Sequence, residues 1–362
     1  MQKYAFYQNF EGWEDFKKRP LGERLPVFFR NGRIFDVLFS QQFDRPFLDA
    51  LYDLTNRIRR IAKMSEGARW LHDLHGHQRA MLYFVQPSTR TFLSFLNACH
   101  ILGFHTSEIR DPQTSSEIKG ESPEDSIRTF SSYVDLIIMR HPQEGFAEKT
   151  AWLLNVYSDR PVPLINAGSG SDQHPTQALL DVYTLQRSFE NRGGIEGKVI
   201  GLVGDLKRGR TVRSLSYLMK NYPGVKILYA APPGFQIGED IKEFLASQKI
   251  LFEEHTSLGP VLSQADAIYM TRIQDEHDEH GESQSHYEGF CIGKKDLAKM
   301  KRDAILMHPL PRRGEIDVAV DKDPRAMYWR QERNGMWTRA ALISVIFGSD
   351  DRIRKEGARF LS

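Results

Sequence analysis

Two kinds of hydrophobic pattern alternate along this chain. Short apolar runs are typical of buried parallel strands, and stretches with apolar residues every three or four positions are typical of amphipathic helices. In the first half the pattern predicts strands at Met81–Val85, Thr106–Ile109, Val134–Met139 and Val162–Asn166. It predicts helices at Phe47–Ile61, Phe92–Leu102, Pro123–Tyr133, Phe146–Tyr157 and Pro175–Arg187. This alternation indicates a parallel sheet with helices on both faces.

A polar segment, Arg187–Gly197, interrupts the alternation and indicates a boundary between domains. After it the pattern predicts strands at Val199–Val203, Lys226–Ala230, Ile250–Glu253, Ala267–Met270 and Ala304–Met307. It predicts helices at Thr211–Lys220, Asp240–Ser247, Gly259–Gln264, Lys294–Met300 and, last, Thr338–Phe347. We therefore expect an α/β fold with two doubly wound parallel-sheet domains in series and a C-terminal helix. The expected divisions are an N-terminal extension (1–35), two domains (36–187 and 188–337) and a C-terminal helix and tail (338–362).

Composition narrows the class of protein. A chain of 362 residues is long for one core, which favours two domains. Its 49 basic and 47 acidic residues give a net charge of +2, so no global field favours nucleic acid or a membrane surface as partner. The two cysteines, Cys99 and Cys291, are far apart and fit neither a disulfide framework nor a metal site. No apolar run is long enough for a membrane span, and Met1–Pro20 lacks the apolar core of a signal peptide. We expect a cytoplasmic protein.

Polar motifs stand where expected strands end, which is where ligands bind in doubly wound folds. They are Ser88–Thr91, Ser115–Ser122, Arg140–Gly145, Asp172–Gln177 and His308–Arg312, and the second domain adds Arg210, Arg272 and Gln274. The first motif opens a helix, where backbone N–H groups and the helix dipole favour an anion, and Arg90 adds a guanidinium. Each motif also has an ordinary structural explanation, such as an N-cap or a solvated cation. Their shared placement favours a site for highly anionic substrates.

Other chemistries find little support. The sequence shows no carboxylate pair, no metal-ligand spacing and no dinucleotide-binding glycine motif, since the spacing in Gly201–Gly204 is wrong. The segment Asp275–Tyr287 is rich in histidine and acids, and a divalent metal is one interpretation. A mobile solvated loop is the interpretation we favour. We therefore expect no metal.

The motifs together resemble a known family. Their residues, in order, are Ser88-Thr89-Arg90-Thr91, Lys119-Gly120-Glu121, Met139-Arg140-His141-Pro142-Gln143-Glu144-Gly145, Gln173-His174-Pro175-Thr176-Gln177, Gly209-Arg210-Thr211-Val212, Thr271-Arg272-Ile273-Gln274 and His308-Pro309-Leu310-Pro311-Arg312. This set resembles the catalytic chains of the aspartate carbamoyltransferase family over roughly residues 36–349. The resemblance implies that carbamoyl phosphate and L-aspartate give N-carbamoyl-L-aspartate and phosphate, an early step of pyrimidine synthesis. It also implies a homotrimer, which can stand alone or form part of a larger assembly. Its active sites would lie between subunits and need no cofactor.

The resemblance also implies a role for each motif residue. Residues 36–187 would form the carbamoyl-phosphate-binding domain and residues 188–337 the aspartate-binding domain. The implied carbamoyl-phosphate ligands are Ser88, Thr89, Arg90, Thr91, Arg140, His174, Gln177, Leu310 and Pro311, of which Thr91, Arg140 and His174 would donate to the carbonyl oxygen. The implied aspartate ligands are Lys119, Arg210, Arg272 and Gln274, with Ser115 and Lys119 supplied by the neighbouring subunit.

Two alternatives and two departures from the family pattern stay open at this point. An ornithine carbamoyltransferase is disfavoured because position 310 is Leu, where that branch typically has Cys, and because the second domain's arginines would repel a cationic side chain. A non-catalytic relative is disfavoured because every phosphate and oxyanion residue is present.

Gln86 stands where the family usually has Glu, and His277 where it usually has Arg. In relatives these two positions belong to a charged network that bridges the domains when they close. The resemblance therefore implies that closure in this chain uses hydrogen bonds, or the acids around His277, in place of that ion pair, unless the two changes are neutral.

Overall fold

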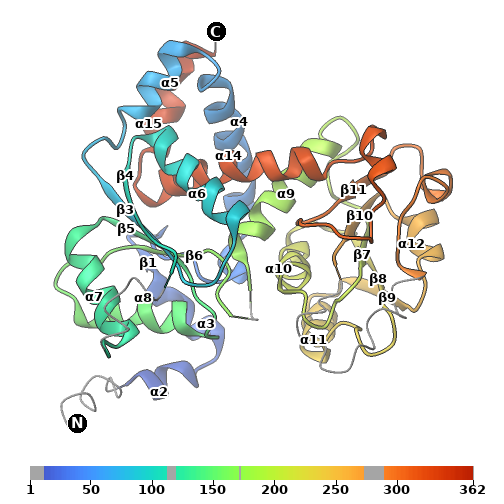
Figure 1. The fold of residues 1–362 in the computed structure, drawn as a ribbon, viewed down its shortest axis with the longest axis horizontal. Helices are drawn as coiled ribbons and strands as arrows, with labels where there is room; N and C mark the ends of the chain where they lie inside the picture. Colours follow the sequence, from blue (N-terminus) through green and yellow to red (C-terminus); the bar gives the residue numbers. More distant parts are fainter. Residues whose placement is uncertain (1–11, 112–119, 171–172, 273–288, 362) are drawn as a thin grey trace. The chain divides into compact units, whose positions relative to one another are not determined.

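A computed structural model describes residues 12–111, 120–170, 173–272 and 289–361 (Figure 1). The chain forms two compact units. Unit 1 comprises Met1–Gln42, Pro46–Thr176 and Met336–Ser362, and unit 2 comprises Phe43–Arg45 and Gln177–Gly335. The α/β fold class with two parallel sheets in series is confirmed.

The centre of unit 1 is a parallel sheet with strand order β4-β3-β5-β6. Its strands are β3 (Arg79–Phe84), β4 (His105–Ile109), β5 (Leu136–Arg140) and β6 (Leu164–Asn166). Its helices are α4 (Arg45–Ile61, in this unit from Pro46), α5 (Ser65–His72), α6 (Thr89–Leu102), α7 (Pro123–Tyr133) and α8 (Phe146–Tyr157). Every residue of β5 is buried, as expected for an inner strand covered on both faces.

An aromatic cluster joins the first described residues to this core. The short helices α2 (Trp13–Lys17) and α3 (Leu21–Arg24) lead into a two-stranded ribbon, β1 (Phe29–Arg30) and β2 (Arg33–Ile34). The rings of Trp13 and Phe16 lie 5.5 and 5.9 Å from that of Trp152 on α8. Both side chains are buried, so they belong to the core of unit 1.

Unit 2 holds a five-stranded parallel sheet in the order β11-β10-β7-β8-β9. The strands are β7 (Val199–Val203), β8 (Lys226–Ala230), β9 (Leu251–His255), β10 (Ala267–Met270) and β11 (Ile305–Met307). The helices are α10 (Arg210–Leu218), α11 (Glu239–Ser247) and α12 (Gly259–Gln264). Two further helices cross the division between the units along the chain, α9 (Pro175–Phe189) and α14 (Tyr328–Ile346). The chain ends in α15 (Asp350–Lys355).

Two of the expected helices differ in the structure. The segment expected as helix Lys294–Met300 forms a 3₁₀ turn, Asp296–Lys299, whose Asp296 carboxylate accepts from the Gly293 N–H. The last long helix begins at Tyr328 and not at Thr338, because buried polar residues such as Gln331 hide its apolar period. Helix α5 was missed, since Gly67 and Leu71 are its only buried residues.

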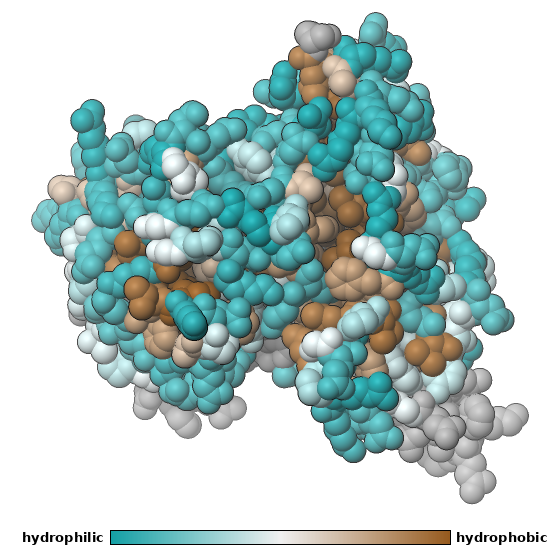
Figure 2. Space-filling view, turned by 180° about the vertical axis from the view of Figure 1, so that it is seen from behind, coloured by the Kyte–Doolittle hydropathy of each residue, from teal (hydrophilic) through white to brown (hydrophobic). Residues whose placement is uncertain are grey.

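The visible surface in Figure 2 is mostly hydrophilic, with several apolar patches. Large apolar side chains that are exposed in the described residues are Met64, Leu93, Tyr133, Val156, Tyr157, Leu251, Val318 and Trp329. None of the helices in the described residues combines the length and the apolar character that a membrane crossing requires.

Candidate active site

The first candidate motif forms the N-terminus of α6. Ser88 is the N-cap residue with an extended backbone, and its side chain makes no capping hydrogen bond. The next residues, Thr89, Arg90 and Thr91, form the first turn, whose N–H groups have no acceptor within the helix. The Gln86 N–H, two residues before the cap, donates to the Arg140 carbonyl at 3.2 Å. The turn therefore lies at the carboxyl edge of the sheet beside the end of β5, where it can hold an anion.

Arg140 and His174 meet at one glycine. Arg140 ends β5 and His174 precedes α9, and their exposed fractions are 8% and 4%. Gly168 lies between them with φ +99°. A Cβ added there would be 2.7 Å from Arg140 Nη1 and 2.8 Å from His174 Cδ2. Arg140 Nη1 donates to the Ala167 carbonyl at 3.2 Å. The structure thus brings two predicted donors together over a backbone without a side chain.

The loop that carries Gly168 is held from within unit 1. The Asn166 side-chain oxygen accepts from the backbone N–H groups of Gly168 (2.9 Å) and Ser169 (2.7 Å). The Ser169 hydroxyl accepts from the His141 N–H at 3.1 Å. Gly170, with φ +61°, packs on Glu144, whose Cα would lie 2.6 Å from an added Cβ. Residues 166–170 are therefore fixed against the segment that follows β5.

His141 is a structural residue. Its ring stacks on Tyr83 and lies 4.1 Å from the ring of Phe146, and its Nδ1 accepts from the Gln143 N–H at 3.1 Å. Burial lowers the pKa of His141 to about 4, so the ring is neutral at physiological pH. It supports the loop after Arg140 and supplies no charge to the site.

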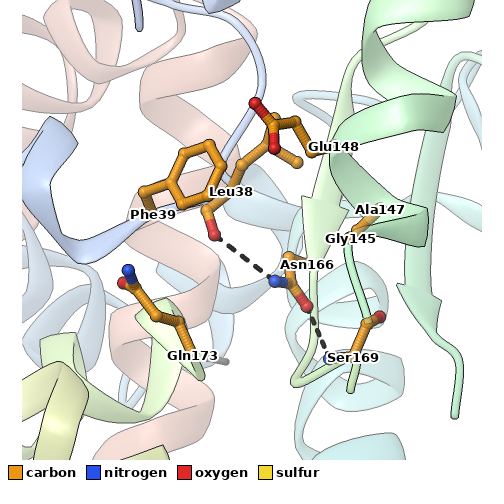
Figure 3. Close-up of a pocket in the computed structure, with 8 residues that line it drawn as sticks. All are labelled: Leu38, Phe39, Gly145, Ala147, Glu148, Asn166, Ser169 and Gln173. Carbon is orange, nitrogen blue, oxygen red and sulfur yellow. Dashed lines mark hydrogen bonds between the residues drawn. The ribbon is translucent and has the colours of Figure 1, made fainter. Parts of the chain in front are cut away.

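A small pocket lies behind this loop (Figure 3). Its lining residues are Leu38, Phe39, Gly145, Ala147, Glu148, Asn166, Ser169 and Gln173. Their polar groups are already engaged. Glu148 forms an ion pair with Arg24, and Gln173 accepts from the Ser40 N–H at 2.8 Å. Asn166 donates to the Leu38 carbonyl, as the dashed line in Figure 3 shows. The pocket therefore belongs to the support of the loop.

In unit 2 the predicted carboxylate ligands also follow strands. Arg210 is the first residue of α10, and burial lowers its pKa to about 10, which leaves it charged at neutral pH. Arg272 follows β10, and its neighbour Thr271 donates from both N–H and hydroxyl to the Val203 carbonyl (2.8 and 2.9 Å). Gly204, with φ +112°, lets this contact form, because an added Cβ would be 2.2 Å from the Thr271 carbonyl oxygen.

The motif after β11 is organised by a buried histidine. His308 Nδ1 accepts from the Leu310 N–H at 2.7 Å, so its Nε2 carries the proton and donates to Glu315 at 2.7 Å. Both side chains are at most 2% exposed. Burial opposes ionisation of Glu315, but the contact with His308 and the backbone N–H groups of Glu315 and Arg313 together outweigh burial and lower the pKa of that carboxyl. Leu310 is thereby held at φ +52°, ahead of a cis bond to Pro311.

Gln177, on α9, lies in a buried hydrogen-bond network within unit 2. Its Nε2 donates to Asp181 Oδ1 at 3.0 Å, and Gln331 Nε2 donates to the same oxygen at 2.7 Å. Gln331 Oε1 accepts from the His308 N–H at 2.9 Å. Gln177 and the Leu310 loop are therefore connected through one carboxyl group.

Comparison with known proteins identifies the family of this chain. The model of the carbamoyl-P binding domain of aspartate/ornithine carbamoyltransferases matches residues 36–187, and that of the Asp/Orn binding domain matches residues 196–346. The chain belongs to the aspartate/ornithine carbamoyltransferase family. It is 42% identical over 321 residues to the chloroplastic aspartate carbamoyltransferase of Oryza sativa subsp. japonica, covering 87% of this chain and 85% of the relative.

Solved structures of the family agree with the fold. The catalytic subunit of M. jannaschii aspartate transcarbamoylase is 35% identical, with a TM-score of 0.75 over 88% of this chain and 99% of that one. Aspartate transcarbamoylase from Trypanosoma cruzi, in complex with carbamoyl aspartate and phosphate, is 32% identical, with a TM-score of 0.75 over 86% of this chain and 95% of that one.

Some predicted residues of the carbamoyltransferase site lie outside the described residues. These are Ser115, Lys119, Gln274, His277 and the segment Asp275–Tyr287. In the part of the chain that the structure describes, no three His, Cys, Asp or Glu side chains are grouped as a metal ion would need.

Sequence reasoning missed the residues that support the predicted site residues, namely Asn166, Gly168, Asp181, Glu315 and Gln331. The Asn-Ala-Gly-Ser-Gly sequence at the end of β6 could have indicated Asn166 and Gly168. Two closely spaced glycines at the end of a strand indicate that another group approaches the backbone closely. Asp181, Glu315 and Gln331 lie in ordinary helix or loop contexts and carried no signal.

Proposed function

We propose that this chain transfers the carbamoyl group of carbamoyl phosphate to the amine of L-aspartate, giving N-carbamoyl-L-aspartate and phosphate in pyrimidine synthesis. The observation that carries the proposal is the packing of Arg140 and His174 against Gly168, at the sheet edge that also holds the N-terminus of α6. An anion site and two buried donors at one edge suit an acyl phosphate, whose phosphate and carbonyl oxygen both need positive partners.

The reaction then follows from the residue types. Ser88, Thr89, Arg90 and Thr91 bind the phosphate, and Arg140, His174 and Thr91 donate to the carbonyl oxygen. The amine nitrogen of aspartate attacks the carbonyl carbon, and the oxygen becomes an oxyanion that these donors stabilise. The bond from the carbon to the phosphate oxygen then breaks. The departing phosphate takes the amine proton, since no side chain suited to act as a base stands out. Each preorganised donor is worth about 3–4 kcal/mol in related acyl chemistry.

The second substrate is a dicarboxylate. Arg210 binds the α-carboxylate, and Arg272 with Gln274 binds the β-carboxylate. Gln177, the Leu310 carbonyl and Pro311 hold the carbamoyl NH₂ group. Arginines suit aspartate because their planar forks match carboxylates, and they disfavour the cationic side chain of ornithine.

One assay separates the alternatives. The purified chain is incubated with carbamoyl phosphate and either L-aspartate or L-ornithine, and carbamoylated product and phosphate are measured. We expect equal amounts of product and phosphate with aspartate, and neither with ornithine above the rate without amine. Product from ornithine alone would assign the other branch, and no product from either would identify a non-catalytic relative.

We further propose that the chain acts as a cytoplasmic homotrimer, with or without partner chains, in which Ser115 and Lys119 enter the neighbouring subunit's site. Both cysteines are free thiols, which suits a reducing compartment. Lys119→Ala and Arg210→Ala should each be nearly inactive alone. Mixed trimers formed after dissociation and reassembly contain one site with both residues intact, so about a quarter of wild-type activity should return. No recovery despite confirmed subunit exchange would show that the site is not shared.

A further inference from the structure

Asp181 is a buried carboxyl one helical turn after Gln177 on α9. It is 0% exposed, and its Oδ1 accepts from two side-chain amides, Gln177 Nε2 at 3.0 Å and Gln331 Nε2 at 2.7 Å. Its Oδ2 is also buried. The hydroxyl of Tyr269, on β10, neighbours the carboxyl, and burial together with this negative neighbour raises the pKa of Tyr269. Nothing in the reaction uses Asp181 directly.

The hydrogen bonds fix the direction of both amides. Burial raises the pKa of Asp181 to about 7, and Oδ1 accepts in either protonation state because a carboxyl proton would sit on Oδ2. Gln177 and Gln331 therefore both present their NH₂ groups to Oδ1. The carbonyl oxygen of Gln331 then faces the other way, and it accepts from the His308 N–H at 2.9 Å. His308 in turn accepts from the Leu310 N–H at 2.7 Å. For Gln177 the same geometry directs its carbonyl oxygen away from Asp181.

We propose that Asp181 is a positioning residue that makes the enzyme selective for an acyl group bearing NH₂. It holds the Gln177 carbonyl oxygen toward the substrate and, through Gln331, fixes the loop that presents the Leu310 carbonyl. Both groups are acceptors, and the carbamoyl NH₂ has two protons to donate. A flipped Gln177 would place its own NH₂ against that donor, and the contact would be repulsive. This inference rests on the proposed function, which assigns Gln177 and Leu310 to the carbamoyl group.

The test compares two phosphonates that differ only in the group of interest. Phosphonoacetamide carries NH₂ where acetonylphosphonate carries CH₃. Each is measured as a competitive inhibitor against carbamoyl phosphate, and the ratio of the two inhibition constants reports the NH₂ contact. A variant that is merely less stable changes both constants alike, so the ratio separates positioning from a structural effect.

Three variants separate the effect of losing the Asp181 acceptors from a general effect of substitution. Asp181→Leu has similar size and removes both acceptors. Asp181→Asn keeps a carbonyl oxygen that can accept from both amides, and its NH₂ would take the place of Oδ2. Thr184→Val is the matched control, because Thr184 Oγ1 lies one turn further on α9 and accepts from Asn334 Nδ2 at 3.0 Å. Both of these residues are buried, and neither hydrogen-bonds to Gln177 in the described network.

We expect Asp181→Leu to lower the preference for phosphonoacetamide about tenfold, the upper range for one net hydrogen bond. Asp181→Asn and Thr184→Val should keep it within twofold. If Asp181→Leu fails to fold, Asp181→Ala should show the same loss. An unchanged ratio in a folded Leu or Ala variant would overturn the inference, and so would an equal fall in Asp181→Asn or Thr184→Val. Wild-type protein that binds neither inhibitor would instead refute the proposed function.

Discussion

Gly168 offers the most direct test of the site geometry. Substitution by alanine adds one methyl group where Arg140 Nη1 would be 2.7 Å away and His174 Cδ2 2.8 Å away. Contacts this short cannot persist, so at least one of the two side chains must move. The Arg140 guanidinium is the end of a flexible chain and can shift. The His174 ring is 4% exposed and has little room.

The expected fall in kcat follows from the displacement of Arg140 or His174. The positive φ of +99° costs an alanine about 1–2 kcal/mol, which lowers stability but not activity as such. Displacing a preorganised donor from a developing oxyanion costs about 10²–10³ in kcat. We therefore expect kcat of Gly168→Ala to fall at least about a hundredfold, with a smaller change in KM for aspartate.

Gly32→Ala is the matched control. Gly32 belongs to the same unit and has φ +74°, but no atom lies within 4 Å of an added Cβ. It should lose comparable stability in a thermal melt and keep wild-type kcat. A folded Gly168→Ala enzyme with kcat within threefold of wild type would refute the argument. Equal activity losses in the two variants would identify backbone strain, and not displacement of the donors, as the cause.

Two further predictions concern substrate choice and pH. Arg272→Ala should raise KM for aspartate about 10- to 100-fold, since a charged hydrogen bond contributes about 1.5–3 kcal/mol, while carbamoyl phosphate binding measured by calorimetry stays nearly unchanged; equal losses for both substrates would contradict the assignment. Burial raises the pKa of Asp36 to about 7, although hydrogen bonds from Asn155 and Leu164 oppose the rise. In this pH range the folded chain therefore keeps a proton that the unfolded chain releases near pH 4. Stability should therefore fall as pH rises from about 4 to 7, by at most about 4 kcal/mol from this group, and melting curves of Asp36→Asn should show a smaller fall; an equal pH dependence in the variant would exclude Asp36 as a source.

Regular elements were predicted well from the sequence where apolar runs end at turn residues. The bounds of β7, β8, β10, α7 and α8 agree with the predicted segments. These elements bury one continuous apolar stretch or stripe, so their period is visible in the residues themselves. Where helices bury polar residues, the period is interrupted, and α14 was predicted ten residues too short at its start.

The contacts of the site could not be predicted in the same way. Glu315 meets His308 and Gln331 meets Asp181 across 7 and 150 residues of chain. No local pattern marks such partners, because what selects them is a buried polar group elsewhere that must be satisfied. The motifs therefore predict which residues touch substrate, but they do not indicate what orients those residues.

A common physical requirement explains why these supporting residues exist. A donor or acceptor that serves a transition state must be held in place before the substrate arrives, and it must also be shielded from water. Shielding makes every unsatisfied polar atom costly, so each such group needs a second partner on its far side. Asp181 supplies that partner for Gln177, and Glu315, through His308, fixes the loop of Leu310. Gly168 meets the requirement differently, since the absent side chain leaves space for Arg140 and His174. Substitutions at these positions should therefore change catalysis without removing any atom that touches substrate.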